Sequence, residues 1–196
     1  MYPLFESIRV EGGQVHLLQY HQARVERSYR QLFQKECNWK LITMLPELPT
    51  TGLHKLRFLY NKRAFSFEIA PYEARKTETL KLIEINDYQY DLKFTDRSGI
   101  DQALALGGDC DDVLMTKNGL LTDTSYCNIL LFDGTDWITP EKPLFEGVQR
   151  SCLLDHKKIQ KASIRSTDLS NYQSFQLINA MNPFVENRFL SVGGIV

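Results

Sequence analysis

The sequence predicts an α+β fold, because strand-like and helix-like segments are mixed along the chain without strict alternation. Its 196 residues, of which 43% are hydrophobic and 24% are charged, are enough to bury a core of ordinary size. Turn-forming residues separate the segments, and the polar stretch 71–77 is the best candidate for a linker. We therefore expect a globular chain of helices and short strands.

Two hairpins and one long helix are predicted in the first 70 residues. Strand-like residues 7–10 and 14–17 flank a Gly-Gly pair, which suits a tight turn. Apolar residues at three-to-four spacing predict a helix over 19–33, and its expected core face contains Val25, Tyr29, Leu32 and Phe33. Arg24 falls on a neighbouring face with His21 and Ser28, so it can point away from these core residues. The second hairpin is predicted to join residues 56–60 and 64–69.

The mixture of strands and helices continues after the linker. The expected strands cover residues 80–85, 112–115, 128–132 and 175–178. The expected helices cover residues 98–106 and 148–154. A turn at residues 117–119 is predicted between the strands 112–115 and 128–132.

Composition excludes several classes of function. A net charge of −1 gives no basic surplus for a nucleic-acid partner. The apolar runs are too short to span a bilayer, and residues 1–6 show no signal-peptide pattern. Four scattered cysteines fit reduced thiols in a cytoplasmic protein. The acidic cluster Asp109, Asp111 and Asp112 has no nearby histidine, so we expect a solvated loop and no metal site.

Three segments contain residues that are able to do chemistry. Lys93 has Arg97 four residues away, a cationic neighbour of the kind that helps a lysine lose its proton, although most such lysines are solvated. Asp123 precedes an apolar strand, where a carboxylate is usually a turn residue but can also pair with a pyridinium nitrogen. Gly147 opens a predicted helix, whose first N–H groups can bind a phosphate or simply begin the helix.

The order and spacing of these segments resemble those of the class IV aminotransferases, the fold type IV pyridoxal-phosphate (PLP) enzymes. This family includes branched-chain and D-amino-acid aminotransferases and 4-amino-4-deoxychorismate lyase. The similar elements are F-E-S-I-R-V at 5–10, H-Q-A-R-V at 21–25, K-F-T-D-R at 93–97, D-D-V-L at 111–114, T-D at 122–123, N-I at 128–129, T-P at 139–140, G-V-Q-R at 147–150 and I-N-A-M-N-P at 178–183. Together they cover nearly the whole chain.

The resemblance implies a two-lobed α+β fold like that of D-amino-acid aminotransferase. The expected lobes are residues 1–72 and the larger 73–196, which would carry the cofactor lysine, with PLP in the cleft that they form. The family's D-R-G-x-x-Y-G-D-G segment has little counterpart before residue 5, so the fold is expected to be N-terminally shortened. Family members form dimers, which implies a homodimer here.

The resemblance also assigns roles to individual residues. Lys93 would be the catalytic lysine that carries the cofactor, and Asp123 would face the pyridine nitrogen. The phosphate would be held by Arg24, by the backbone amides of Val148 and Gln149, and by Asn179. Two of these positions depart from the family pattern, because Asp123 replaces a glutamate and Gln149 replaces a threonine.

A small amino compound is the implied substrate. The element at 178–183 and the K-x-x-D-R form favour the lyase, which makes 4-aminobenzoate and pyruvate for the folate pathway. A branched-chain or D-amino-acid aminotransferase is the alternative. The contrasting class is an inactive, cofactor-binding relic or a small binding protein, because the N-terminal segment that helps to form the substrate pocket is missing.

Overall fold

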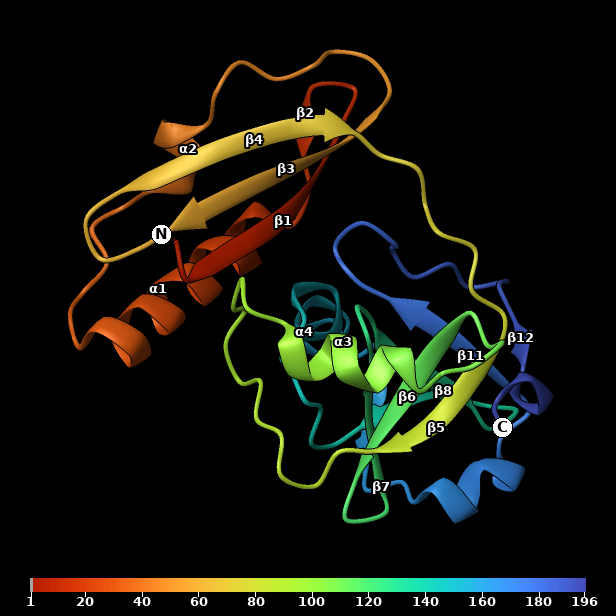
Figure 1. Ribbon diagram of the computed structural model, residues 1–196. Coiled ribbons are helices and arrows are strands. Elements are labelled where there is room, and N and C mark those ends of the chain that lie inside the picture. The colour runs from red at the N-terminus through yellow and green to blue at the C-terminus, as the bar shows by residue number, and fades with distance from the viewer. Residues whose placement is uncertain (1) are drawn as a thin grey trace. The chain divides into compact units, whose positions relative to one another are not determined.

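The computed structural model describes residues 2–196, which form two compact units (Figure 1). The first, unit 1, contains the residues up to Ala74 together with Leu92–Asp96. The second, unit 2, contains Arg75–Asp91 and Arg97–Val196. Both combine helices with a sheet, which confirms the predicted α+β class.

Unit 1 contains an antiparallel sheet with the strand order β2-β1-β3-β4, and the helix α1 packs against it (Figure 1). Its strands are β1 (Leu4–Glu11), β2 (Gln14–Val15), β3 (Leu53–Tyr60) and β4 (Phe65–Pro71). Its helices are α1 (Leu18–Phe33) and the short α2 (Leu41–Met44), which the sequence did not predict. Both predicted hairpins are present.

The core of unit 1 forms where the sheet meets α1. Alternation along β1 directs Leu4, Ile8 and Val10 to the same face, and all three are fully buried. Val25 and Tyr29 of α1 join this cluster as predicted. The prediction for Leu32 was wrong, because that side chain is 37% exposed near the end of the helix. The neighbouring face of α1, expected to lie apart from the core, is buried as well.

The segment around Lys93 differs from the expected division of the chain. The sequence placed it in the second lobe, but Leu92–Asp96 groups with unit 1. The cause is direct pairing with β1: the Phe5 N–H donates to the Lys93 carbonyl at 3.0 Å, and Leu4 forms a β-bridge with Phe94. Leu92 is buried in the core of unit 1. Lys93 therefore lies beside the first strand of the chain.

Unit 2 is built on an eight-stranded mixed sheet. The main order is β10-β9-β8-β7-β6-β5, and β11 pairs with β8 and β12. The strands are β5 (Leu80–Glu84), β6 (Asp112–Lys117), β7 (Leu120–Thr124), β8 (Asn128–Phe132), β9 (Trp137–Pro140), β10 (Gln160–Ala162), β11 (Ser174–Ile178) and β12 (Leu190–Ser191). The helices are α3 (Ser98–Ala105), α4 (Val148–Asp155), and the 3-10 helices η1 (Ser166–Asn171) and η2 (Val192–Gly194).

One connection in unit 2 corrects the sequence analysis. The turn at 117–119 joins β6 to β7, a strand that was not predicted, and β8 follows after a further turn. Asn118 and Gly119 have φ angles of 51° and 73°, the left-handed conformation that these two residue types tolerate best. Asp123 consequently lies within a strand and not in a turn.

Both faces of the unit 2 sheet are covered. Ile129 and Leu131 of β8 belong to one buried cluster, whereas Leu130 between them belongs to another. This alternation is what a strand buried on both sides requires. Leu153 of α4 packs in the cluster of Leu130, which places the helix on that face.

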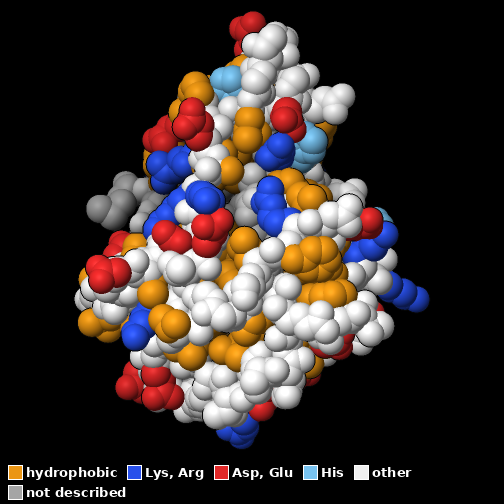
Figure 2. Space-filling view, turned by 90° about the vertical axis from the view of Figure 1, so that its right-hand side faces the viewer, with side chains coloured by type: hydrophobic (Ala, Val, Ile, Leu, Met, Phe, Trp, Pro, Cys, Tyr) orange, Lys and Arg blue, Asp and Glu red, His pale blue; other side chains and the backbone are white. Residues whose placement is uncertain are grey.

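None of the helices within residues 2–196 combines the length and the apolar character needed to cross a bilayer. On the face drawn in Figure 2, lysines and arginines lie beside aspartates and glutamates, with apolar side chains among them. Mixed charges of this kind agree with the net charge of −1.

Candidate active site

Lys93, the predicted cofactor lysine, is half-buried in unit 1. Its backbone is fixed by the pairing with β1, and its Nζ lies 4.8 Å from the centre of the Phe5 ring. An ammonium group above an aromatic face gains a cation–π interaction. The structure therefore holds Lys93 against the sheet, unlike the fully solvated lysine that such a sequence stretch usually contains.

Arg24, the predicted phosphate ligand, is buried in α1 and paired with Glu6 of β1. Its Nε donates to Glu6 Oε1 at 2.9 Å, and its Nη2 donates to Glu6 Oε2 at 2.5 Å. This two-point contact fixes the plane of the guanidinium group. Lys93 and Arg24, which are 69 positions apart in the sequence, thus both lie in unit 1.

His21 completes a buried cluster with Arg24 and Glu6. Its Nδ1 lies 2.6 Å from Glu6 Oε2, and neither side chain is exposed to solvent. Burial alone raises the pKa of Glu6, but the charge of Arg24 and the bond with His21 outweigh it and lower that pKa to about 2. Burial lowers the pKa of His21, and the bond with Glu6 opposes this only in part. The cluster therefore has an ionised glutamate at its centre.

Sequence reasoning did not identify Glu6 as a site residue, although a signal was present. Glu6 alternates in register with Leu4, Ile8 and Val10, and the strand pattern therefore directs its carboxylate into the core. A buried carboxylate requires a cation, and Arg24 is the one that α1 supplies. Glu6 is accordingly a residue that orients Arg24.

The buried pair predicts a pH-dependent loss of stability in Glu6→Gln. Leaving Arg24 buried without its carboxylate should lower the free energy of unfolding at pH 7 by about 3 to 5 kcal/mol. Because the folded pKa of Glu6 lies below its ordinary value of 4.5, its contribution is complete above that pH. The contribution is then lost as the pH falls towards 2. Urea unfolding at pH 7, 5 and 3 measures this difference.

Glu11→Gln is the matched control, because Glu11 lies in the same strand but its ion pair with Arg9 is exposed. We expect this control to change the free energy of unfolding much less than Glu6→Gln does, because water screens an exposed ion pair. Equal losses in the two variants would contradict the interpretation of Glu6 as a buried counterion.

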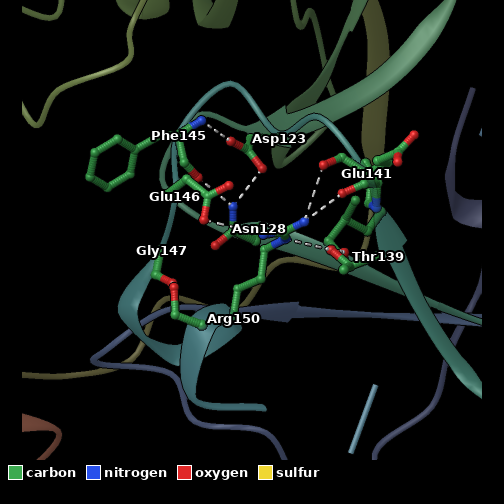
Figure 3. A network of polar contacts seen from close by, with 11 residues as sticks. Asp123, Asn128, Thr139, Glu141, Phe145, Glu146, Gly147 and Arg150 are labelled. Carbon is green, nitrogen blue, oxygen red and sulfur yellow. Dashed lines mark hydrogen bonds and ion pairs between the residues drawn. The ribbon is translucent and has the colours of Figure 1, made fainter. Parts of the chain in front are cut away.

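Asp123, the predicted partner of the pyridine nitrogen, is buried in β7 of unit 2. Its Oδ1 accepts from Asn128 Nδ2 at 2.6 Å, and its Oδ2 accepts from the Phe145 N–H at 2.7 Å (Figure 3). Burial raises the pKa of Asp123 to about 7, against the bonds from Asn128 and Phe145 and the charge of Arg150. A buried carboxylate with this pKa is suited to a ring nitrogen that carries a proton.

Arg150 is the largest fully buried side chain in the structure, and it lies below this network (Figure 3). Its Nη2 donates to the Pro140 carbonyl at 2.9 Å, its Nε contacts Thr139 Oγ1 at 3.3 Å, and its Nη1 lies 3.5 Å from Glu146 Oε2. It therefore ties α4 to the end of β9. Arg150 belongs to the G-V-Q-R motif at 147–150, but the sequence indicated no role for it.

Val148 and Gln149 form the first turn of α4, as predicted. Gly147 before them is extended, with φ −73° and ψ 142°. The N–H groups of a first helical turn have no acceptor within the helix and can bind an anion. Because those amides belong to the backbone, glutamine at position 149 is compatible with this role.

Asn179 follows β11, and its side chain is engaged by the protein. Its Oδ1 accepts from the N–H groups of Met181 and Asn182, and its Nδ2 donates to the Tyr126 carbonyl and lies 3.0 Å from Cys127 Sγ. These bonds shape the turn after β11. A phosphate contact by Asn179, as the sequence suggested, would have to replace one of them.

The donor set of each unit fits a part of PLP. Unit 2 brings together a buried carboxylate and the start of a helix, joined by Asn128 and Phe145. Unit 1 contains a half-buried amine, that of Lys93, and an arginine fixed by a glutamate. Residues 2–196 contain no cluster of histidine, cysteine or acidic side chains arranged to hold a metal ion. These residue types match an anionic, aldehyde-bearing pyridine compound.

Comparison with known proteins agrees with this chemistry. An uncharacterized protein of Haemophilus influenzae is 36% identical over 186 residues, which cover 93% of this chain and 99% of that protein. A proposed 4-amino-4-deoxychorismate lyase from Haemophilus somnus has a similar structure, with a TM-score of 0.89 and 34% identity over 94% of this chain and 98% of its own. A hypothetical aminotransferase from Mycobacterium tuberculosis in its PLP-bound form has the same fold, with a TM-score of 0.78 and 17% identity over 96% and 83% of the two chains.

The profile of the family Amino-transferase class IV matches residues 3–186, nearly the whole chain. The match includes the segments of both units that contain Lys93, Arg24 and Asp123. The chain therefore belongs to the class IV aminotransferases and is a pyridoxal-phosphate-dependent enzyme.

Proposed function

We propose that this enzyme is a 4-amino-4-deoxychorismate lyase, which releases pyruvate and leaves 4-aminobenzoate. The observation that carries the proposal is the likeness to the Haemophilus somnus protein, at 34% identity over 98% of its length. That protein is itself a proposed lyase of this specificity. Within the family, the N-A-M-N-P element at 179–183 and the K-x-x-D-R form at 93–97 favour the same reaction.

In this proposal Lys93 is the catalytic residue. Bound PLP supplies an aldehyde that takes up an amine and a ring that withdraws electrons from the adjoining carbon. The Lys93 amine would hold the cofactor. The same amine would accept the proton from the substrate carbon that bears the nitrogen. Its fixed backbone beside β1 limits the positions from which it can accept that proton.

The other residues hold and polarise the cofactor. Asp123 faces the pyridine nitrogen, and its ionised form stabilises the protonated ring. Arg24, kept in plane by Glu6, and the amides of Val148 and Gln149 bind the phosphate. Asn179 contributes at most through the turn that it shapes. Anchoring the ring at two ends keeps it in register with Lys93.

A class IV aminotransferase of branched-chain or D-amino acids is the second candidate. It would use the same residues but transfer the amine and return a 2-oxo acid. The class IV profile fits this activity equally well. A homodimer remains part of the proposal, and sedimentation equilibrium of the purified protein measures it.

Two parallel assays separate these activities. The purified protein with PLP is expected to release pyruvate from 4-amino-4-deoxychorismate and to form no glutamate from amino acids and 2-oxoglutarate. The Lys93→Ala protein serves as the blank for both assays. Formation of glutamate without release of pyruvate would show that the enzyme is an aminotransferase and not a lyase. Neither product, from a protein that binds PLP, would contradict the lyase and favour a different amino substrate.

A further inference from the structure

Asn128 joins the two functional parts of unit 2 through one nitrogen atom (Figure 3). Its Nδ2 donates to Asp123 Oδ1 at 2.6 Å and to the Phe145 carbonyl at 2.9 Å. The Phe145 N–H closes the ring by donating to the second oxygen of Asp123 at 2.7 Å. The carboxylate on β7 and the loop before α4 are thus bonded to the same side chain. Asn128 is itself buried and faces Asp123 in the β7–β8 register.

The oxygen of the Asn128 amide restricts which residue can stand directly before α4, at position 147. A Cβ atom placed on Gly147 would lie 2.0 Å from Asn128 Oδ1. Such a contact is far inside van der Waals distance, so either the amide or the start of α4 would have to move. Glycine is required at position 147 because the Asn128 oxygen occupies that space, although its φ of −73° suits any residue.

From these contacts we propose that Asn128 is a positioning residue, which fixes the Asp123 carboxylate and the first turn of α4 relative to each other. The inference rests on the proposed roles of Asp123 and of the amides at Val148 and Gln149. One side chain then sets the separation between the group that faces the ring nitrogen and the groups that bind the phosphate. Because the cofactor ring has a fixed size, a change in this separation weakens one anchor or the other.

The charge of Asp123 depends on the same bond. A donor to a buried carboxylate stabilises the ionised form, so loss of the Asn128 amide raises the pKa of Asp123 above about 7. Arg150 is the charged group among the main influences on the pKa of Asp123, and it remains in place. At neutral pH the carboxylate of an Asn128→Ala variant would therefore be mainly protonated in the cofactor-free protein.

A double-mutant cycle with Asn128→Ala and Gly147→Ala tests the proposal. Affinities for PLP and for pyridoxal, which lacks the phosphate, would be measured by absorbance, together with the pH titration of the bound cofactor's band. We expect Asn128→Ala to weaken PLP binding about ten- to hundredfold, to reduce the preference for PLP over pyridoxal and to shift the titration. Gly147→Ala should weaken PLP binding in the wild-type background and add little once Asn128 is alanine.

Gln176→Ala is the matched control. Gln176 is a fully buried amide in β11 with three bonds to the backbone of residues 185 and 188, and none of these bonds involves Asp123. The Gln176→Ala substitution should lower the free energy of unfolding. The pH titration of the bound cofactor's absorbance band should stay where it is in the wild type. If Asn128→Ala behaves in the same way, or if Gly147→Ala costs the same in both backgrounds, the positioning role is wrong.

The proposed function and this inference can fail separately. Absence of PLP binding to the wild-type protein would contradict the proposed function. The contact between Asn128 and Gly147 is also tested without cofactor, by the free energies of unfolding of the four proteins in the cycle. A cost of Gly147→Ala that vanishes with Asn128→Ala supports the contact, and an additive cycle overturns it.

Discussion

Replacing Lys93 by alanine is expected to lower turnover about 10³-fold or more and to remove the long-wavelength absorbance band of the bound cofactor. Both effects follow if the Lys93 amine is the group that holds PLP and then moves the substrate proton. Half-burial above the Phe5 ring restricts where that amine can reach. The measurements are product formation under saturating substrate and the spectrum of the protein titrated with PLP.

Lys62→Ala is the matched control, because Lys62 is an exposed lysine in the β3–β4 turn of the same unit. It should keep both the band and the turnover. Persistence of the band in Lys93→Ala would show that another lysine carries the cofactor. The proposed roles of Arg24 in binding the phosphate and of Glu6 in orienting Arg24 would then lose their support.

Replacing Asp123 by alanine is expected to lower turnover about 10²- to 10³-fold while PLP stays bound. The cofactor would still be held by Lys93 and by its phosphate ligands, but no carboxylate would stabilise the protonated ring. Burial raises the pKa of Asp123 to about 7, so a protonated ring nitrogen beside it would favour the ionised form of the carboxylate. Turnover and the cofactor spectrum of the same sample measure the two effects separately.

Asp123→Glu tests whether charge is what matters at this position, since glutamate is the usual residue of the family. The extra methylene must fit where the bonds to Asn128 and Phe145 are 2.6 and 2.7 Å long. Turnover between that of the wild type and that of Asp123→Ala is therefore expected. Unchanged turnover in Asp123→Ala would mean that the acid only shapes β7.

Hairpins and helices with clear turn signals were predictable from the sequence, but β7 was not. Its segment Leu120–Thr124 contains two threonines and an aspartate, and aspartate is a residue type that favours turns. In the structure these polar groups are buried because each has a partner: Thr122 donates to the Met115 carbonyl, and Asp123 accepts from Asn128. Such partners are set by sheet register, which local composition does not encode.

The residues that position other site residues could not be predicted from the sequence either. Glu6 and Arg24 are 18 positions apart, and only the packing of α1 on β1 shows that they form a pair. Asn128 and Gly147 meet because β8 and the start of α4 approach closely. The resemblance to a family pointed to Arg24, Lys93 and Asp123 through motif order. It could not indicate which neighbours hold them.

The return of Leu92–Asp96 to the first strand has a consequence for biosynthesis. Unit 1 cannot complete its fold when residue 74 leaves the ribosome. Its last segment begins only at Leu92, which is encoded 18 codons further on. A chain that ended at Ala74 would lack both the strand partner of Phe5 and the amine of Lys93. Genetic fragmentation of this chain should therefore cut beyond Asp96 if the first fragment is to keep Lys93.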